Sequence, residues 1–191
     1  MTGAKNLLFL VGGVEMAVLI EGISVVVRCD KNLGAYQGGV AQFKRDVPND
    51  SLRADGKLAA VTFLNPVDVE TYVRTLESRG LRFKDELGAL DIVVVDQRSG
   101  FCFPCSWAEF GRTEWNGESD KEVSVCAVGA DLPQPVVVPD GWSFDRSLSA
   151  SHHFIGEQGL PPAMRLVRRE EELDVYLDDA TGVEFFSRRF K

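Results

Sequence analysis

The run MAVLIEGISVVV at residues 16–27 constrains the fold more than any other part of the chain. Its residues are nearly all apolar, and many of them are β-branched. Such a run is typical of a strand that is buried on both faces of a sheet. Gly22 is the expected site of a bulge, because a glycine inside a strand pattern often marks one. With 191 residues, the chain is long enough to bury this strand in one large domain, or in a core with a small appendage.

Two helices are expected to cover the sheet. Residues 33–47 carry apolar side chains at roughly helical spacing, with Asn32 as a candidate N-cap, although three glycines weaken this pattern. The second helix, over residues 65–80, is clearer, because Asn65 can cap it and Pro66 suits its first turn. Its buried face is expected to consist of Val69, Tyr72, Val73 and Leu76.

Further strands are indicated by β-branched or alternating runs between turn residues. They are expected at residues 58–64, 90–96, 101–107, 122–128, 164–168, 173–177 and 183–189. The runs 90–96 and 101–107 should form a hairpin, and the last three runs a meander. The sequence thus predicts an α+β protein with a mixed or antiparallel sheet, two helices on one face, a βαβββ-like module and a C-terminal β-meander.

The expected organisation has three parts. Residues 1–15 are an N-terminal leader or an extra segment, residues 16–130 form an α+β core domain, and residues 131–191 form a β-rich C-terminal segment that packs on the core. Three prolines just after the boundary favour this division, because proline excludes a central strand or a helix interior.

One part of the chain resembles a known family. The order strand, helix, strand, strand, strand over residues 58–107 is that of a βαβββ module. The phrase LESRGLRF, followed by the VVVDQRSG hairpin, is similar to the corresponding part of vicinal oxygen chelate enzymes. The resemblance covers about a quarter of the chain and implies a sheet of that kind, without the metal-binding His or Glu pair on two halves.

The negative charge is concentrated in the middle of the chain. The protein has 21 basic and 29 acidic side chains, a formal net charge of -8, and residues 85–140 hold 3 basic and 11 acidic ones, which accounts for the whole excess. A field of this sign repels phosphate groups, so nucleic acid and anionic membranes are poor partners. The four cysteines are too few for a disulfide framework, which favours a cytoplasmic protein with reduced thiols.

The segment from residue 109 to residue 122 combines aromatic and acidic side chains. Its candidate partner-binding residues are Glu109, Phe110, Glu114, Trp115, Glu118, Asp120 and Glu122. Exposed aromatic side chains within a negative field are suited to dock a basic partner, because the carboxylates attract it and pair with Lys or Arg. The alternative is that Phe110 and Trp115 pack beneath a solvated acidic loop.

Cys102 and Cys105 form a Cys-x-x-Cys motif, which can close a disulfide or supply two zinc ligands. His152 and His153, the two histidines of the chain, are weak candidates for completing such a metal site. However, no helix N-terminus follows the motif to lower a thiol pKa, and adjacent histidine side chains diverge. Two half-buried structural thiols are the favoured interpretation.

No coherent catalytic set emerges from the sequence. A Gly-x-Ser-x-Gly elbow and phosphate-binding glycine loops are both absent, and no cofactor is expected. We therefore expect a non-catalytic binding protein, an acidic inhibitor of the immunity or antitoxin type that docks a basic partner protein. The alternatives are a small-molecule or metal-dependent enzyme on a vicinal-oxygen-chelate-like sheet, and thiol redox through Cys102 and Cys105. The sequence leaves the oligomeric state open.

Overall fold

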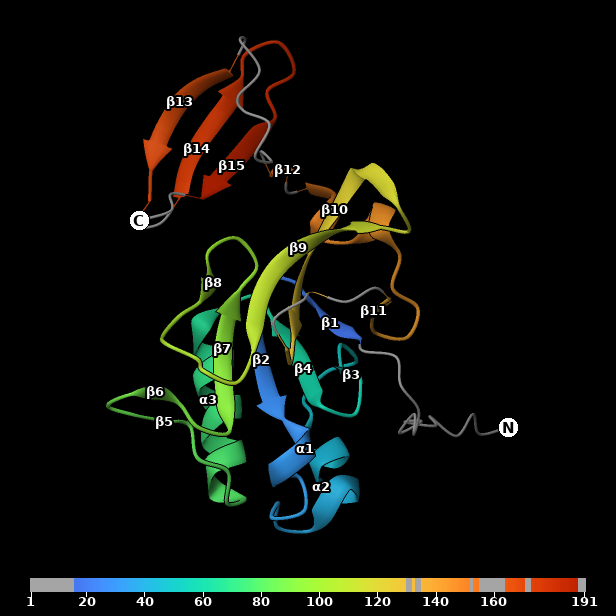
Figure 1. Ribbon diagram of the computed structural model, residues 1–191, viewed down its shortest axis with the longest axis vertical. Coiled ribbons are helices and arrows are strands. Elements are labelled where there is room, and N and C mark those ends of the chain that lie inside the picture. The colour runs from blue at the N-terminus through green and yellow to red at the C-terminus, as the bar shows by residue number, and fades with distance from the viewer. Residues whose placement is uncertain are drawn as a thin grey trace.

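The computed structural model describes residues 16–129, 132, 135–151, 153–154, 164–170 and 173–188. Within this part of the chain, the strands form a five-stranded sheet, two four-stranded sheets and a two-stranded ribbon (Figure 1). Together with the helices, these sheets confirm the expected α+β fold with mixed and antiparallel sheets. The expected N-terminal segment, residues 1–15, lies outside the described residues.

The apolar run at residues 16–27 forms two strands rather than one. β1 (Ala17–Ile20) and β2 (Ile23–Arg28) are separated by Glu21 and Gly22, and they belong to different sheets. Gly22 has a φ of +53°, and a Cβ atom at this position would lie 2.6 Å from the carbonyl oxygen of Phe63. The prediction of one bulged strand was therefore wrong, because glycine here lets the chain cross from one sheet to the other.

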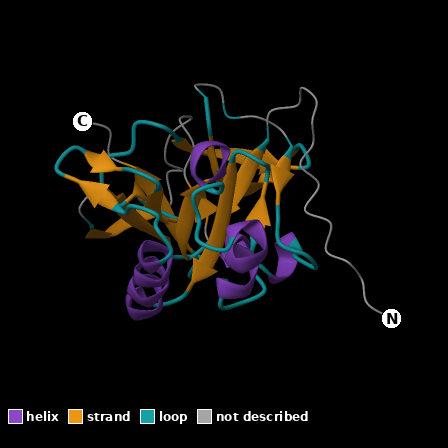
Figure 2. Cartoon of the chain, turned by 90° about the horizontal axis from the view of Figure 1, so that it is seen from below, coloured by secondary structure: helices purple, strands orange, loops and turns teal. Residues whose placement is uncertain are grey.

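The five-stranded sheet has the order β3-β4-β2-β7-β8 and is antiparallel throughout. Besides β2, it consists of β3 (Arg53–Ala54), β4 (Leu58–Phe63), β7 (Ile92–Asp96) and β8 (Gly100–Phe101). The helices α2 (Gly39–Asp46) and α3 (Pro66–Ser78) cover one face of it, as expected (Figure 2). A short ribbon of β5 (Lys84–Asp85) and β6 (Gly88–Ala89) lies between α3 and β7 in the chain.

The second expected helix is confirmed as α3. The side chain of Asn65 accepts a hydrogen bond of 2.9 Å from the backbone N–H of Asp68, and Pro66 is the first helical residue. The buried side chains of the helix are the four expected ones, Val69, Tyr72, Val73 and Leu76.

The first expected helix begins later than the spacing predicts. α2 begins at Gly39, after a turn and a four-residue helix, α1 (Cys29–Asn32), which contains the residue expected as the N-cap. Gly38 and Gly39 have φ values of +91° and +66°, which are left-handed values that a continuous α-helix excludes. The apolar positions in this region are nevertheless buried against the sheet, as shown by Leu33, Tyr36 and Phe43.

A four-stranded sheet packs on the other face of the five-stranded sheet. Its order is β11-β1-β10-β9, and it is built from β1, β9 (Glu109–Trp115), β10 (Glu118–Ala127) and β11 (Val136–Val137). The layer between the two sheets contains Val18, Ile20, Val26, Ala60, Val93, Val95 and Cys126. The outer face of the four-stranded sheet is covered by Trp142 and Phe144, which pack over Leu19 and Val125. β1 is therefore buried on both faces, which explains its uniformly apolar sequence.

The segment between residues 101 and 121 differs most from the expectation. The expected strand 101–107 ends at Phe101, and residues 102–108 are irregular. The polar residues that follow form β9 and the start of β10, which are joined by a two-residue turn at Asn116 and Gly117. These two residues have φ values of +53° and +74°, the positive values that a tight hairpin turn requires. The acidic segment is thus a β-hairpin and not a loop.

The C-terminal strands form a separate four-stranded sheet of order β12-β15-β14-β13. The three expected strands of the meander are present, and a fourth, β12, is parallel to β15. The bounds are β12 (His153–Phe154), β13 (Met164–Arg169), β14 (Leu173–Asp178) and β15 (Glu184–Arg188). The guanidinium carbon of Arg98, in the β7–β8 turn, lies 5.5 Å from the ring centroid of Phe186.

Candidate functional site

The acidic residues expected to bind a partner lie on the β9–β10 hairpin. Glu114 of β9 is directly opposite Glu122 of β10, and the pairing is irregular between Glu118 and Glu122. Because side chains alternate across a strand, Phe110, Glu114 and Glu122 lie on one face of the hairpin, and Trp115 lies on the other.

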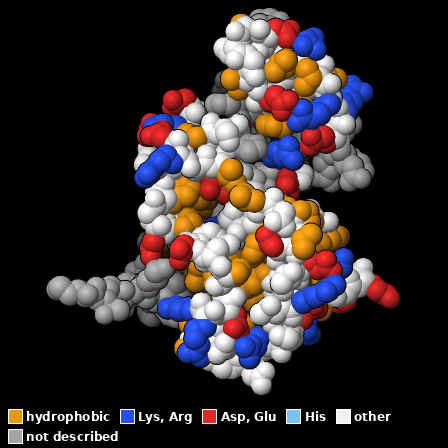
Figure 3. All heavy atoms as spheres, turned by 180° about the vertical axis from the view of Figure 1, so that it is seen from behind, with side chains coloured by type: hydrophobic (Ala, Val, Ile, Leu, Met, Phe, Trp, Pro, Cys, Tyr) orange, Lys and Arg blue, Asp and Glu red, His pale blue; other side chains and the backbone are white. Residues whose placement is uncertain are grey.

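Most of these acidic side chains are exposed to solvent. Glu109, Glu114, Glu118 and Asp120 are exposed, and Glu122 is half-buried. The carboxylate of Glu118 lies 2.7 Å from the ammonium group of Lys121, so part of its charge is neutralised within the hairpin. Acidic and basic side chains are also interspersed on the face of the molecule shown in Figure 3. The hairpin therefore collects all five expected acidic residues, but its charge is not uniform.

An open groove runs along the hairpin beside the facing glutamates. It has a volume of about 470 Å³, and the residues that line it are Arg112, Thr113, Glu114, Gly117 and Glu122. Burial raises the pKa of Glu122, Arg112 lowers it, and the nearby Glu114 raises it again. A cation that enters the groove would contact both carboxylates. It would attract each of them, whereas the two carboxylates repel each other.

Arg112 is the basic residue of the groove. Its Nη2 atom donates a hydrogen bond of 2.7 Å to the backbone carbonyl of Arg98, and its guanidinium carbon lies 5.8 Å from the ring centroid of Phe110. Both contacts lie toward β8 and away from the hairpin turn. The two glutamates are thus accompanied by a positive charge at one end of the groove.

The two aromatic residues of the expected site are both packed against other rings. The ring centroids of Trp115 and Trp142 are 4.7 Å apart, and those of Phe110 and Phe101 are 6.3 Å apart, both in edge-to-face geometry. Phe110 and Trp115 are half-buried. These contacts favour the alternative in which the aromatic side chains pack beneath the acidic residues, which leaves the carboxylates as the main exposed feature.

Cys102 and Cys105 lie in the irregular segment after β8, and both are free thiols. Cys105 is half-buried as expected, whereas Cys102 is exposed, because the strand that was expected to hold it ends at Phe101. Burial raises the pKa of Cys102, and the nearby carboxylate of Asp96 raises it further. Burial also raises the pKa of Cys105, although backbone N–H groups partly oppose this effect. Redox-active thiols have lowered pKa values, so these surroundings do not favour thiol redox chemistry.

The metal candidates are only partly described by the structure. His152 lies outside the described residues, and only the backbone of His153, in β12, is described. Among the described side chains, no three His, Cys, Asp or Glu residues come together in a group that could hold a metal ion.

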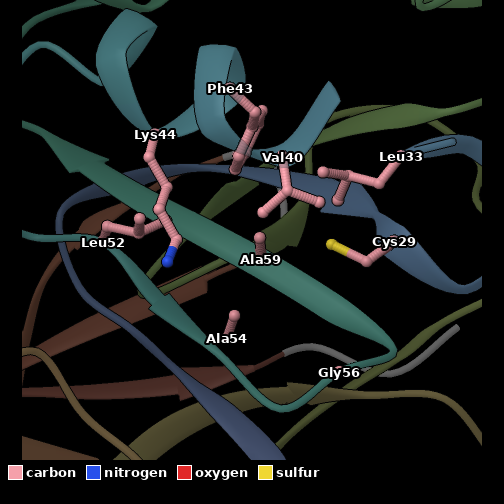
Figure 4. Close-up of a pocket in the computed structure, with 9 residues that line it drawn as sticks. All are labelled: Cys29, Leu33, Val40, Phe43, Lys44, Leu52, Ala54, Gly56 and Ala59. Carbon is pink, nitrogen blue, oxygen red and sulfur yellow. The ribbon is translucent and has the colours of Figure 1, made fainter. Parts of the chain in front are cut away.

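A small apolar cavity lies between α2 and the β3–β4 edge of the five-stranded sheet (Figure 4). Val40 and Phe43 point into it from α2, and Cys29 lines it from the first residue of α1. Its volume is about 10 Å³, which is room for a single water molecule. Burial strongly raises the pKa of Cys29, so its thiol stays protonated. This cavity is a packing defect and is too small to hold an organic ligand.

A cluster of buried polar residues was not anticipated from the sequence. Its members are Glu21, Ser24, Arg53, Gln97, Ser124 and Ser149. The backbone N–H and the hydroxyl of Ser149 donate to Glu21 Oε1 at 3.0 and 2.8 Å, and Trp142 Nε1 donates to Glu21 Oε2 at 3.0 Å. Glu21 itself was the signal, because a carboxylate inside an apolar run is costly unless it is hydrogen-bonded.

Comparisons of the chain with protein-family models, with curated proteins and with solved structures give no match. None of the helices in the described part of the chain is long and apolar enough to cross a membrane.

Proposed function

We propose that the protein is a non-catalytic binding protein that docks a basic partner protein on its β9–β10 hairpin, as an inhibitor of the immunity or antitoxin type. The observation that supports this proposal is the position of Glu114 and Glu122, which face each other across the hairpin in an open groove. Like charges directly opposite on paired strands destabilise the pairing. A lysine or arginine side chain of a partner would offset this cost, because it attracts both carboxylates.

The other acidic residues of the hairpin would act at longer range. Glu109 and Asp120 are exposed, and they extend the negative charge along β9 and around the turn. Exposed charges of this kind mainly raise the rate of association and lose their effect at high salt. The groove therefore supplies the close contacts of the proposed interface, and the outer carboxylates steer the partner toward it.

The test is affinity capture from a lysate of the source organism with matched charge-reversal variants. The hairpin variant carries Glu114→Lys, Glu118→Lys and Asp120→Lys. The control variant carries the same number of reversals at exposed positions elsewhere, Glu70→Lys, Glu77→Lys and Glu86→Lys. Because both variants have the same net charge, a difference between them reports the location of the charge.

We expect a basic protein to be retained by the wild type and the control variant and to be lost with the hairpin variant. Purified partner should then bind the wild type more weakly as the salt concentration rises. Equal retention by all three proteins, or equal loss in both variants, would show that the hairpin is not the docking site.

A further inference from the structure

We propose that a second cavity, beneath residues 141–148, binds a small zwitterion of the α-amino-acid type. The cavity is open to solvent on one side, as the groove of the hairpin is. It has a volume of about 400 Å³, and the side chains that matter for its chemistry are Glu21, Trp142, Arg146 and Leu148. This volume lies within the range of roughly 300–1,000 Å³ that is usual for small-molecule sites. The site is distinct from the groove of the hairpin, and its binding does not depend on the function proposed above.

Glu21 supplies a fixed negative charge in this cavity. The residue is only 8% exposed, and its carboxylate accepts two hydrogen bonds from Ser149 and one from Trp142. A carboxylate can accept about four hydrogen bonds, so one position on Oε2 has no donor among the described residues. The three hydrogen bonds from Ser149 and Trp142 hold the carboxylate in place. The side chain of Glu21 would therefore not have to move in order to accept a hydrogen bond from an ammonium group.

The buried guanidinium of Arg53 does not occupy that position. Its charge is close enough to Glu21 for the two to attract each other, and this attraction partly offsets the effect of burial on the pKa of Arg53. Its nitrogen atoms, however, donate their hydrogen bonds to main-chain and hydroxyl oxygens of other residues, namely Leu19, Ser24, Ser51 and Thr62. Glu21 therefore keeps an acceptor for a group that comes from the cavity.

Arg146 supplies the opposite charge. Its Nε atom donates to the hydroxyl of Ser143 at 3.3 Å, and its side chain is exposed. No carboxylate among the described residues lies within ion-pair distance of it. The two terminal nitrogens of the guanidinium can thus bind a ligand carboxylate in the two-point geometry that arginine favours.

An apolar wall separates these charges from the core. The indole of Trp142 is held in edge-to-face contact with Trp115 and Phe144, at 4.7 and 6.5 Å between ring centroids. Leu148 also lines the cavity. An α-amino acid has the groups that these lining residues call for: its ammonium group would bind Glu21, its carboxylate would bind Arg146, and its side chain would contact Trp142 and Leu148.

The first experiment uses the wild-type protein with ligands that differ by one charge. L-Leucine, L-phenylalanine and L-lysine are titrated by calorimetry, and the indole N–H signal of Trp142 is followed by NMR, since this group donates to Glu21. N-acetyl-L-leucine lacks the ammonium group, and L-leucinamide lacks the carboxylate. We expect leucine to bind and to shift the Trp142 signal, and the two leucine derivatives to bind about tenfold more weakly or worse than leucine.

The second experiment removes the guanidinium. Arg146→Gln should weaken binding about tenfold or more, whereas Arg45→Gln should leave it unchanged, because Arg45 is an exposed arginine of α2 that bonds to Gln42. Glu21→Gln should also abolish binding, but it disturbs the bonds to Ser149 and Trp142, so Arg146→Gln carries the test. The proposal is overturned if leucine does not shift the Trp142 signal at millimolar concentration, if either derivative binds as well as leucine, or if Arg146→Gln binds like the wild type.

Discussion

The Nε atom of Arg53 in the five-stranded sheet donates a hydrogen bond of 2.6 Å to the backbone carbonyl of Leu19 in the four-stranded sheet. The same side chain donates to the hydroxyls of Ser24 and Thr62 at 2.8 and 2.9 Å, and it is only 2% exposed. A buried guanidinium is costly unless its donors are satisfied. Arg53 therefore links the two sheets through a set of bonds that must form together.

Replacing Arg53 with methionine should lower the free energy of unfolding by about 3 kcal/mol or more, because it leaves a buried carbonyl and two hydroxyls without their donor. Urea denaturation followed by circular dichroism measures this loss. The exposed Arg45→Met should change stability by no more than about 0.5 kcal/mol. Equal denaturation midpoints for Arg53→Met and the wild type would mean that the bonds between the sheets contribute nothing to stability.

Variants of Trp115 test whether this aromatic residue of the hairpin supports the fold. Trp115→Ala should lower the free energy of unfolding by about 2–4 kcal/mol, because it leaves Trp142 without its edge-to-face neighbour. Trp115→Phe should cost less, since it keeps a ring at this position. Thermal unfolding of both variants checks the order. An Ala variant as stable as the wild type would show that the contact between Trp115 and Trp142 does not support the fold.

Glu122 should destabilise the folded protein at neutral pH. Burial raises its pKa above the ordinary value of 4.5; Arg112 lowers the pKa, Glu114 raises it again, and the net shift is upward, so folding favours the neutral carboxyl group. The favourable contribution is present below pH 4.5 and is lost as the pH rises through the raised pKa. Glu122→Gln should therefore be more stable than the wild type at pH 7, and the difference should shrink toward pH 4. Denaturant midpoints that differ by the same amount at both pH values would contradict the raised pKa.

The thiols of Cys102 and Cys105 should react slowly with alkylating agents. Burial raises the pKa of both, so the reactive thiolate is scarce at pH 7. Mass spectrometry after timed treatment with iodoacetamide should show slower modification of both residues than of a cysteine in an unfolded peptide, and faster modification as the pH increases. Rapid labelling of either residue at pH 7 would restore the redox hypothesis.

Local signals in the sequence were sufficient for some elements and misleading for others. α3 could be predicted because Asn65, Pro66 and one apolar stripe specify a helix independently of the rest of the chain. β9 could not be predicted from alternation, because none of its residues is buried and both of its faces carry polar side chains. The Asn116–Gly117 pair was the signal for this hairpin, and a greater weight on it would have found β9.

The candidate site, too, could be predicted from the sequence only in part. The acidic residues are close in sequence, so their presence in one segment could be inferred before the hairpin was known. The packing of Trp115 could not, because its partner Trp142 comes from a distant part of the chain. The crossing at Gly22 was missed because a left-handed glycine is compatible both with a bulge and with a change of sheet.

The crossing at Gly22 also has a consequence for the order in which the chain assembles. β2 pairs with β4 and β7, whereas β1, which precedes it directly, pairs with β10 and β11. During synthesis, the helical layer and the five-stranded sheet can therefore form while β1 still lacks its neighbours. We expect this apolar strand to stay exposed until β10 has emerged from the ribosome, which makes it the segment most in need of protection from aggregation.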